Sequence, residues 1–277
     1  MDAAAGQKVP GPCAPTHRRP DWGAHNPVVY ALCPIVLFPR CNSPLAAGPV
    51  LCYTGLHANR TTDTSKRAGA QPGALVHRHP FQPARPRTGG SLRRQVVHEL
   101  VTYQFDHPAF AGIEHAVFTR LGGVSRGALA SLNVGRSVGD DPAAVSENLR
   151  RIYAHLGLAA GQVVTPWQVH SNRIAVVSGH DAEQIVPNTD GLVTATPGLA
   201  LLLRFADCQP ILLYDPEHHA LGLVHAGWRG VAQGVAIRAV EAMQASFGTR
   251  PRALIAGLGP AIGPCCYVVG DEVAAAM

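Results

Sequence analysis

The chain has 277 residues, enough for one large domain or for one domain with an extension. Hydrophobic residues make up 47% of it and charged residues 15%, which excludes a wholly disordered or fibrous protein. The net charge of +5 is unevenly divided: residues 1–95 carry 12 Lys and Arg against 3 Asp and Glu, whereas residues 96–277 carry 11 against 15. The sequence therefore joins two unlike parts, and the acidity of the second argues against nucleic-acid binding.

Residues 1–95 show neither helical nor strand periodicity, and Pro, Gly, Ala and Arg recur in them without order. Such a segment buries too little apolar area to offset its backbone entropy. We therefore expect a disordered basic extension, or translated sequence upstream of the true start. Its one apolar stretch, residues 28–38, is interrupted by Pro34 and follows Arg18 and Arg19. The alternative is a twin-arginine export signal, but no small-residue cleavage site follows closely.

Residues 96–277 have the pattern of a folded domain. Residues 114–119 predict a strand that enters a glycine-rich turn. Asp141 and Pro142 then predict a helix start, and Gly157 predicts its end. Between them, four apolar residues mark one helical face: Val145, Leu149, Ile152 and Leu156.

Short apolar runs follow, separated by turn sequences such as TPG and DPEHH. They cover residues 162–169, 173–177, 199–205, 211–214 and 220–224. A helix over residues 230–247 and a strand over residues 253–256 come next. Several connections are too short for crossover helices, so we predict a single mixed α/β domain with a largely antiparallel sheet and packing helices. The chain ends soon after a helix begins near Asp271, so we expect the natural domain to continue beyond Met277.

The cysteine count and the hydropathy indicate the cellular compartment. The chain has 7 cysteines, an odd number without the spacing of a disulfide framework, which favours reduced thiols in the cytoplasm. No apolar run reaches the length of a membrane-spanning helix, so no membrane association is expected.

Three segments place a metal-competent or nucleophilic side chain at the end of a predicted strand: WQVH, ADCQP and HAGWRG. Their candidates are His170, Cys208 and His225. Two imidazoles and one thiolate form a known ligand set for catalytic zinc with an open fourth position, and they also suit copper. The spacings match no compact zinc finger. The alternatives are a cysteine that packs as a small hydrophobe and histidines with structural hydrogen bonds.

Four further residues are candidates for binding or orientation. Arg229 stands at a predicted helix start, where exposed amides and a guanidinium could hold phosphate; alternatively this is a tight turn with Trp228 on the core. Arg120 is either a second anion contact or a solvated turn residue. Asn133 could bind a substrate or shape a turn. Asp207 could orient a metal ligand or cap its turn.

Seven motifs in this order resemble the YfiH-like family, long labelled multicopper polyphenol oxidase or laccase. They are TRLGGVS, SLNVG, GDDPAAVSENLRR, QVH, ADCQP, HAGWRG and GPAIGPCCYVVGDEV. The resemblance covers about residues 98–277 and implies one α/β domain with a metal site at His170, Cys208 and His225, usually zinc. Family members are described as purine nucleoside phosphorylases with adenosine deaminase activity. Their chains normally run on past the end of this one.

The resemblance thus implies phosphorolysis of adenosine, inosine and S-methyl-5'-thioadenosine, and deamination of adenosine. Purine nucleosides and phosphate are then the partners, and Arg229 is the expected phosphate contact. Three rivals remain. One is oxidation of phenols by copper, although residues 96–277 lack the His-x-His pairs typical of blue-copper oxidases. Another is a hydrolase with Cys208 as nucleophile and a histidine base. The last is a binding protein with structural zinc.

Overall fold

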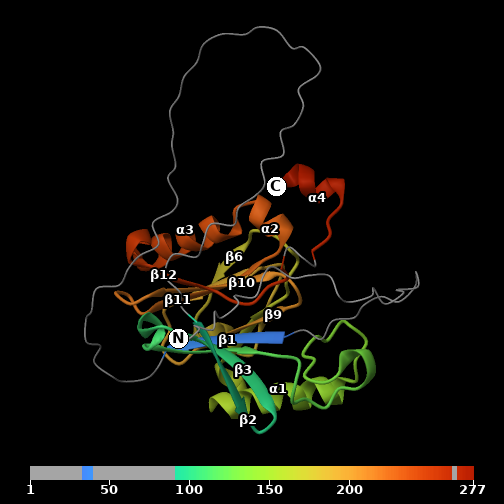
Figure 1. The fold of residues 1–277 in the computed structure, drawn as a ribbon. Coiled ribbons are helices and arrows are strands. Elements are labelled where there is room, and N and C mark those ends of the chain that lie inside the picture. Colours follow the sequence, from blue (N-terminus) through green and yellow to red (C-terminus); the bar gives the residue numbers. More distant parts are fainter. Residues whose placement is uncertain (1–32, 40–90, 264–266) are drawn as a thin grey trace, which may run out of the picture.

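The computed structural model describes residues 33–39, 91–263 and 267–277, which form two β-sheets with helices on their outer faces (Figure 1). The first sheet has seven strands in the order β2-β3-β4-β1-β9-β5-β7, and the second has five in the order β12-β10-β11-β8-β6. The strands are β1 (Cys33–Pro39), β2 (Ser91–Val97), β3 (Leu100–Asp106), β4 (Ile113–Phe118), β5 (Val163–Pro166), β6 (Ile174–Val176), β7 (Ile185–Val186), β8 (Gly191–Thr194), β9 (Ala200–Phe205), β10 (Gln209–Asp215), β11 (Ala220–Ala226) and β12 (Ile255–Leu258). The helices are α1 (Pro142–Leu156), α2 (Trp228–Ala232), α3 (Val235–Phe247) and α4 (Asp271–Ala276).

The elements form four layers, from α1 through the seven-stranded and five-stranded sheets to α3 (Figure 1). Strand β9 shows how the sequence produces this order, because its alternate side chains serve two cores. Leu201 and Leu203 belong to the core between the two sheets. Ala200 and Leu202 belong to the core beneath α1. A strand buried on both faces reads as a continuous apolar run, as the first four residues of β9 do.

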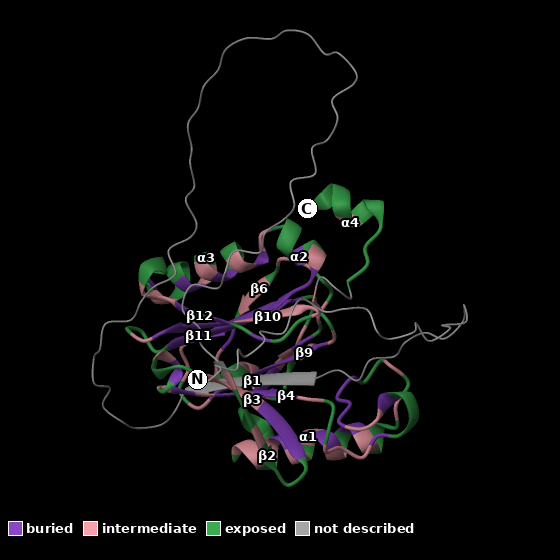
Figure 2. Cartoon of the chain, in the orientation of Figure 1, coloured by how far each residue is buried: buried purple, intermediate pink, exposed green. Residues whose placement is uncertain are grey.

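Helix α1 confirms the predicted start, face and end. The side chain of Asp141 accepts a hydrogen bond from the amide of Ala143, and Gly157 ends the helix with a left-handed φ of 65°. Val145 and Ile152 on the predicted apolar face are buried. The outer faces of the helices are exposed, whereas the sheets between them are mostly buried (Figure 2).

The predicted helix over residues 230–247 is wrong as one continuous element. Gly234 adopts a left-handed φ of 76°, which an α-helix cannot contain, and the segment divides there into α2 and α3. Helix α3 packs Val235, Ala239 and Met243 on the five-stranded sheet.

The fold class is confirmed: mixed α/β with mostly antiparallel strand pairs. Apolar runs of the sequence coincide with β5, β6, β9, β10 and β11. The structure adds three parallel pairings that the sequence analysis did not foresee, between β5 and β9, β5 and β7, and β6 and β8.

The boundary expected at residue 95 falls inside β2. Strand β1 also lies within residues 1–95, in the one apolar stretch of that segment, and pairs antiparallel with β4 and β9. The rest of the expected extension, including Arg18 and Arg19, lies outside the described residues. Within the described part of the chain, no helix has both the length and the apolar character to span a bilayer.

Candidate metal centre and adjoining cavity

A β-hairpin and a loop bring the three candidate metal ligands together. Cys208 directly precedes β10, and His225 is the next-to-last residue of β11, where the register pairs it with Pro210. His170 lies in the loop that follows β5. One ligand atom from each side chain lies within 4.8 Å of the others. Three residues distant in sequence therefore present two imidazoles and a thiol to one point.

The packing around this group fixes the two rings. The imidazoles of His170 and His225 meet edge to face, with centroids 4.7 Å apart, and Phe205 packs against His225 with centroids 5.5 Å apart. His225 is buried, whereas His170 is exposed. Gly227 has no room for a side chain: an added Cβ would lie 2.9 Å from Cδ2 of His170 and 3.2 Å from Sγ of Cys208. This close approach gives the first glycine of HAGWRG a structural reason.

Asp190 contacts both the His170 loop and the His225 ring. Its carboxylate is fully buried and accepts hydrogen bonds from the amides of Val169, His170 and Ser171 at 3.2, 2.9 and 2.6 Å and from the Ser171 hydroxyl at 2.7 Å. It also lies 2.9 Å from Nδ1 of His225. That bond leaves Nε2 of His225 free to act as a ligand. One side chain thus positions both the His170 loop and the His225 ring.

The electrostatics favour a thiolate at Cys208. Burial alone would raise the pKa of this thiol, but hydrogen bonds from His170 and His225 lower the pKa to about 6. Burial would also lower the pKa of His225, but its bonds to Asp190 and Cys208 raise that pKa to about 9. The Cys208 thiolate is the form that metal binding requires, whereas His225 must lose its second ring proton when a metal binds, so binding releases a proton.

The donor set fits zinc. Zinc takes imidazole nitrogen and thiolate sulfur, and catalytic sites use three protein ligands with an open position. His170 is exposed, and together with His225 it lines a cavity. A second group, formed by Asp215, Glu217 and His218, lies at the far end of the same hairpin, where Asp215 bonds the backbone of its own turn.

A cavity of about 310 Å³ opens beside the metal-ligand group. Its apolar walls include Trp167 and Ile185, which are half exposed. Two arginines share the lining with the histidines. The full lining is Arg136, Ser137, Trp167, Gln168, His170, Ile185, Arg204, Ala206 and His225. It combines an apolar surface, positive charge and the candidate metal ligands.

Arg229 lies away from this cavity. Its side chain is 53% exposed, ion-paired to Glu272 at 3.2 Å and stacked over Trp228 at 4.3 Å from the ring centroid. Gly230 has no room for a side chain, because an added Cβ would lie 2.9 Å from the carbonyl oxygen of Ser171. The glycines of HAGWRG therefore allow the His170 loop to lie close to α2.

The other three candidates do not line the cavity either. Arg120 is exposed, and its carbonyl oxygen accepts bonds from the Ser131 and Leu132 amides. Asn133 is buried and bonds Asp140 and the backbone of Gly135, so it shapes its turn. Asp207 is exposed, and its backbone oxygen accepts a bond from the amide of Ile262. The carboxylate that bonds a candidate metal ligand is that of Asp190.

Three residues of the site were not predicted from the sequence: Asp190, Arg136 and Arg204. Asp190 stands directly before β8, a strand that was not predicted, although an acidic residue in NTDG before an apolar run was a usable signal. Arg136 follows the SLNVG motif by one residue, and Arg204 interrupts an apolar strand. A single charged residue inside a buried strand is rare and is a candidate functional residue.

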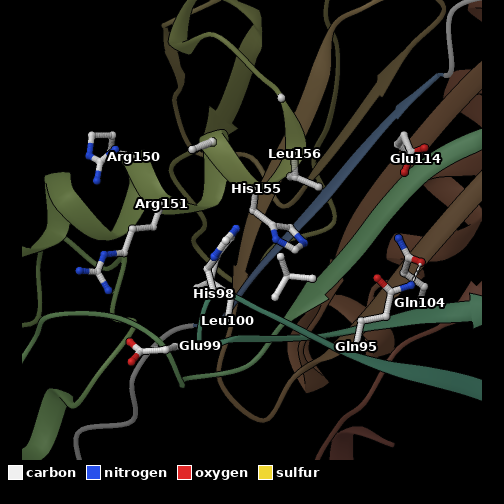
Figure 3. Close-up of a pocket in the computed structure, with 13 residues that line it drawn as sticks. Gln95, His98, Glu99, Leu100, Gln104, Glu114, Arg150, Arg151, His155 and Leu156 are labelled. Carbon is white, nitrogen blue, oxygen red and sulfur yellow. Dashed lines mark hydrogen bonds between the residues drawn. The ribbon is translucent and has the colours of Figure 1, made fainter.

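A larger cavity of about 1160 Å³ lies between the β2–β3 turn and the end of α1 (Figure 3). His98 and His155 lie close together there, and burial followed by the charge of His98 lowers the pKa of His155. Arg150, Arg151 and Glu99 complete a charged rim. None of the lining residues belongs to a metal-competent group of the described chain, so size alone does not identify the reactive site.

Comparison with known proteins places this site in a family. The family model described as multi-copper polyphenol oxidoreductase laccase matches residues 114–277, which contain all three candidate ligands. A Streptomyces griseus protein named purine nucleoside phosphorylase ORF3 is 46% identical over 166 residues, which cover 59% of this chain and 67% of the relative. The purine nucleoside phosphorylase YlmD of Geobacillus stearothermophilus is 42% identical over 173 residues, which cover 60% and 63%.

Two solved structures are similar to this chain in fold and in sequence. The crystal structure of YlmD from Geobacillus stearothermophilus has a TM-score of 0.63 at 39% identity and covers 66% of this chain and 69% of that one. A hypothetical protein YfiH from Bacillus licheniformis has a TM-score of 0.61 at 33% identity, with 65% and 68% covered. The chain spans about two thirds of the length of the relatives that it matches.

Proposed function

The chain belongs to the multi-copper polyphenol oxidoreductase laccase family, also called YfiH-like, and from this premise we propose that it is a purine nucleoside phosphorylase with adenosine deaminase activity. The observation that carries the proposal is the cavity in which His170 and His225 share one lining with Trp167 and two arginines. Relatives that carry the phosphorylase name support it. The proposed substrates are adenosine, inosine and S-methyl-5'-thioadenosine together with phosphate.

The cavity walls suit a nucleoside. Trp167 and Ile185 offer exposed apolar surface to a purine ring, and an indole face can stack on a base. The side-chain amide of Gln168 is already hydrogen-bonded and is not available to the base. Its Oε1 accepts from the amide of Arg204 at 2.9 Å, and its Nε2 donates to the carbonyl oxygen of Arg204 at 2.7 Å. The polar end of the cavity is therefore left to the arginines and the histidines.

In the proposed reaction, an oxygen of phosphate forms a bond to C1′ of the ribose while the bond from C1′ to N9 of the purine breaks. The electron pair of the broken bond stays with the purine, which takes up a proton, and the products are the free base and ribose 1-phosphate. Positive charge develops at C1′, and the phosphate must be held in line with it.

We propose that His170, Cys208 and His225 hold one zinc ion. When bound, zinc would supply a Lewis acid that brings the pKa of a coordinated water towards 7, which suits hydrolytic removal of the purine amino group. Asp190 keeps Nδ1 of His225 protonated and the His170 loop in place, so that both imidazoles face the thiolate. The buried Phe205 packs against the His225 ring and limits water on that side.

The copper-oxidase alternative is less well supported by the side chains. A multicopper oxidase needs many histidines for its several copper ions. In the described part of the chain, the metal-competent groups are the His-Cys-His set and a turn with one histidine. The Cys–His hydrolase alternative shares its residues with the proposed zinc site, and zinc would occupy the thiolate that such a hydrolase needs free.

The test is to incubate the protein with adenosine and phosphate without oxygen and to identify the products. Adenine with ribose 1-phosphate is expected from phosphorolysis, and inosine with ammonia from deamination. Reaction without oxygen excludes phenol-oxidase chemistry as the source. Absence of both product pairs, with folded and zinc-loaded protein, would overturn the proposal.

A further inference from the structure

Arg136 and Arg204 form a pair of positive charges at the wall of the cavity beside the metal-ligand group. Arg204 lies on β9, and Arg136 lies in the loop between β4 and α1. Both also line an adjoining cavity of about 670 Å³ beneath α1. Two guanidinium groups from distant segments therefore meet at the boundary between the two cavities.

The positive charges of this arginine pair are not neutralised by a carboxylate of the described residues. Burial lowers the pKa of Arg204, and the positive charge of Arg136 lowers it further. An Nη atom of Arg204 donates to the carbonyl oxygen of Pro166 at 2.6 Å, which fixes the guanidinium without neutralising it. Within residues 91–263 and 267–277, neither arginine forms an ion pair, although Glu183 lines the adjoining cavity.

Holding two like charges together without an anion costs free energy, and a half-buried arginine is normally paired. Each guanidinium has a planar fork of donors that matches the oxygens of a phosphate group. The hydroxyl of Ser137, in the same lining, offers a further donor. These features together describe a site for a compact anion with two or more charged oxygens.

We propose that Arg136 and Arg204 bind inorganic phosphate at the mouth of the cavity, next to the nucleoside. The identity of the anion rests on the proposed function, whereas the site rests on the paired arginines. This assignment replaces Arg229, which pairs with Glu272 outside the cavity. It places the phosphate in the same lining as Trp167, on which the base would stack.

Arg136→Gln tests the assignment, because Arg136 is exposed and its replacement is expected to leave the fold intact. Arg94→Gln is the matched control: Arg94 is also exposed, and it lies on β2, at the opposite edge of the sheet from β5 and β7. We expect Arg136→Gln to raise the KM for phosphate by at least about tenfold, because a charge-assisted bond is lost. The KM for adenosine should change little. Arg136→Lys should recover part of the phosphate affinity.

The ³¹P NMR line width of inorganic phosphate measures binding without turnover. Line broadening by the wild type and by Arg94→Gln that is lost in Arg136→Gln supports the site. If the wild type phosphorolyses adenosine but Arg136→Gln keeps the wild-type phosphate KM and line width, the site is wrong and the proposed function stands. If phosphate binding depends on Arg136 but no ribose 1-phosphate forms, the site stands and the proposed function is wrong.

Discussion

Replacing Cys208 with alanine is expected to remove zinc from the protein and to lower phosphorolysis and deamination by at least about a thousandfold. The reason is the loss of the one anionic donor among three ligand atoms that lie within 4.8 Å of one another. Two imidazoles alone bind zinc much more weakly than two imidazoles and a thiolate. Zinc content and the initial rates of both reactions are the measurements.

His180→Ala is the control for this substitution. His180 is exposed in the turn after β6 and belongs to no metal-competent group of the described residues, so this variant should keep its zinc and both rates. Thermal unfolding of the Cys208→Ala variant shows whether the fold survives. A folded Cys208→Ala protein with near-normal turnover would exclude both metal and thiol chemistry at this site.

Asp190→Asn is expected to weaken zinc affinity by about tenfold to a hundredfold and to lower the free energy of unfolding by about 2 kcal/mol. An asparagine of the same shape must place its amide NH₂ against backbone N–H donors or against Nδ1 of His225. Burial alone would raise the pKa of Asp190, but bonds from His225 and Ser171 lower it to about 2. Because the folded-state pKa is depressed, this stabilisation is present above pH ~4 and is lost only as the pH falls through about 2.

Asp215→Asn is the matched control, because Asp215 is also fully buried and also bonds backbone amides and a histidine Nδ1. It lies at the other end of the hairpin from Cys208. Both variants should lose stability, but only Asp190→Asn should lose zinc affinity in a chelator competition. Equal losses of stability with unchanged zinc affinity in both variants would show that Asp190 has only a structural role.

The sequence predicted helices and strands well where the residues of the element itself determine its structure. Asp141, Pro142 and Gly157 set the bounds of α1, and the apolar runs marked β9, β10 and β11. The metal-ligand group was predictable because each member lies in a short, distinctive motif beside or near the end of a strand, with His225 inside β11, Cys208 directly before β10 and His170 in the loop after β5. The resemblance to a known family added the expectation that these three strand ends meet.

Other parts depended on contacts between distant segments. Asp190 acts through backbone amides of residues 169–171, and no local pattern reveals that pairing. Arg136 and Arg204 approach each other only because the loop before α1 returns to β9. Arg229 was predicted to contact phosphate at a helix start, and the structure places it on a helix of five residues, where it pairs with Glu272 outside the lining of the cavity.

The most direct test of the metal centre is zinc X-ray absorption spectroscopy of the purified full chain. One zinc per chain is expected, with one sulfur at about 2.3 Å and two imidazole nitrogens at about 2.0 Å in the first coordination shell. The Cys208→Ala variant should lose the sulfur contribution. A wild-type spectrum with no sulfur contribution, or a protein that binds no zinc at all, would contradict the proposed site.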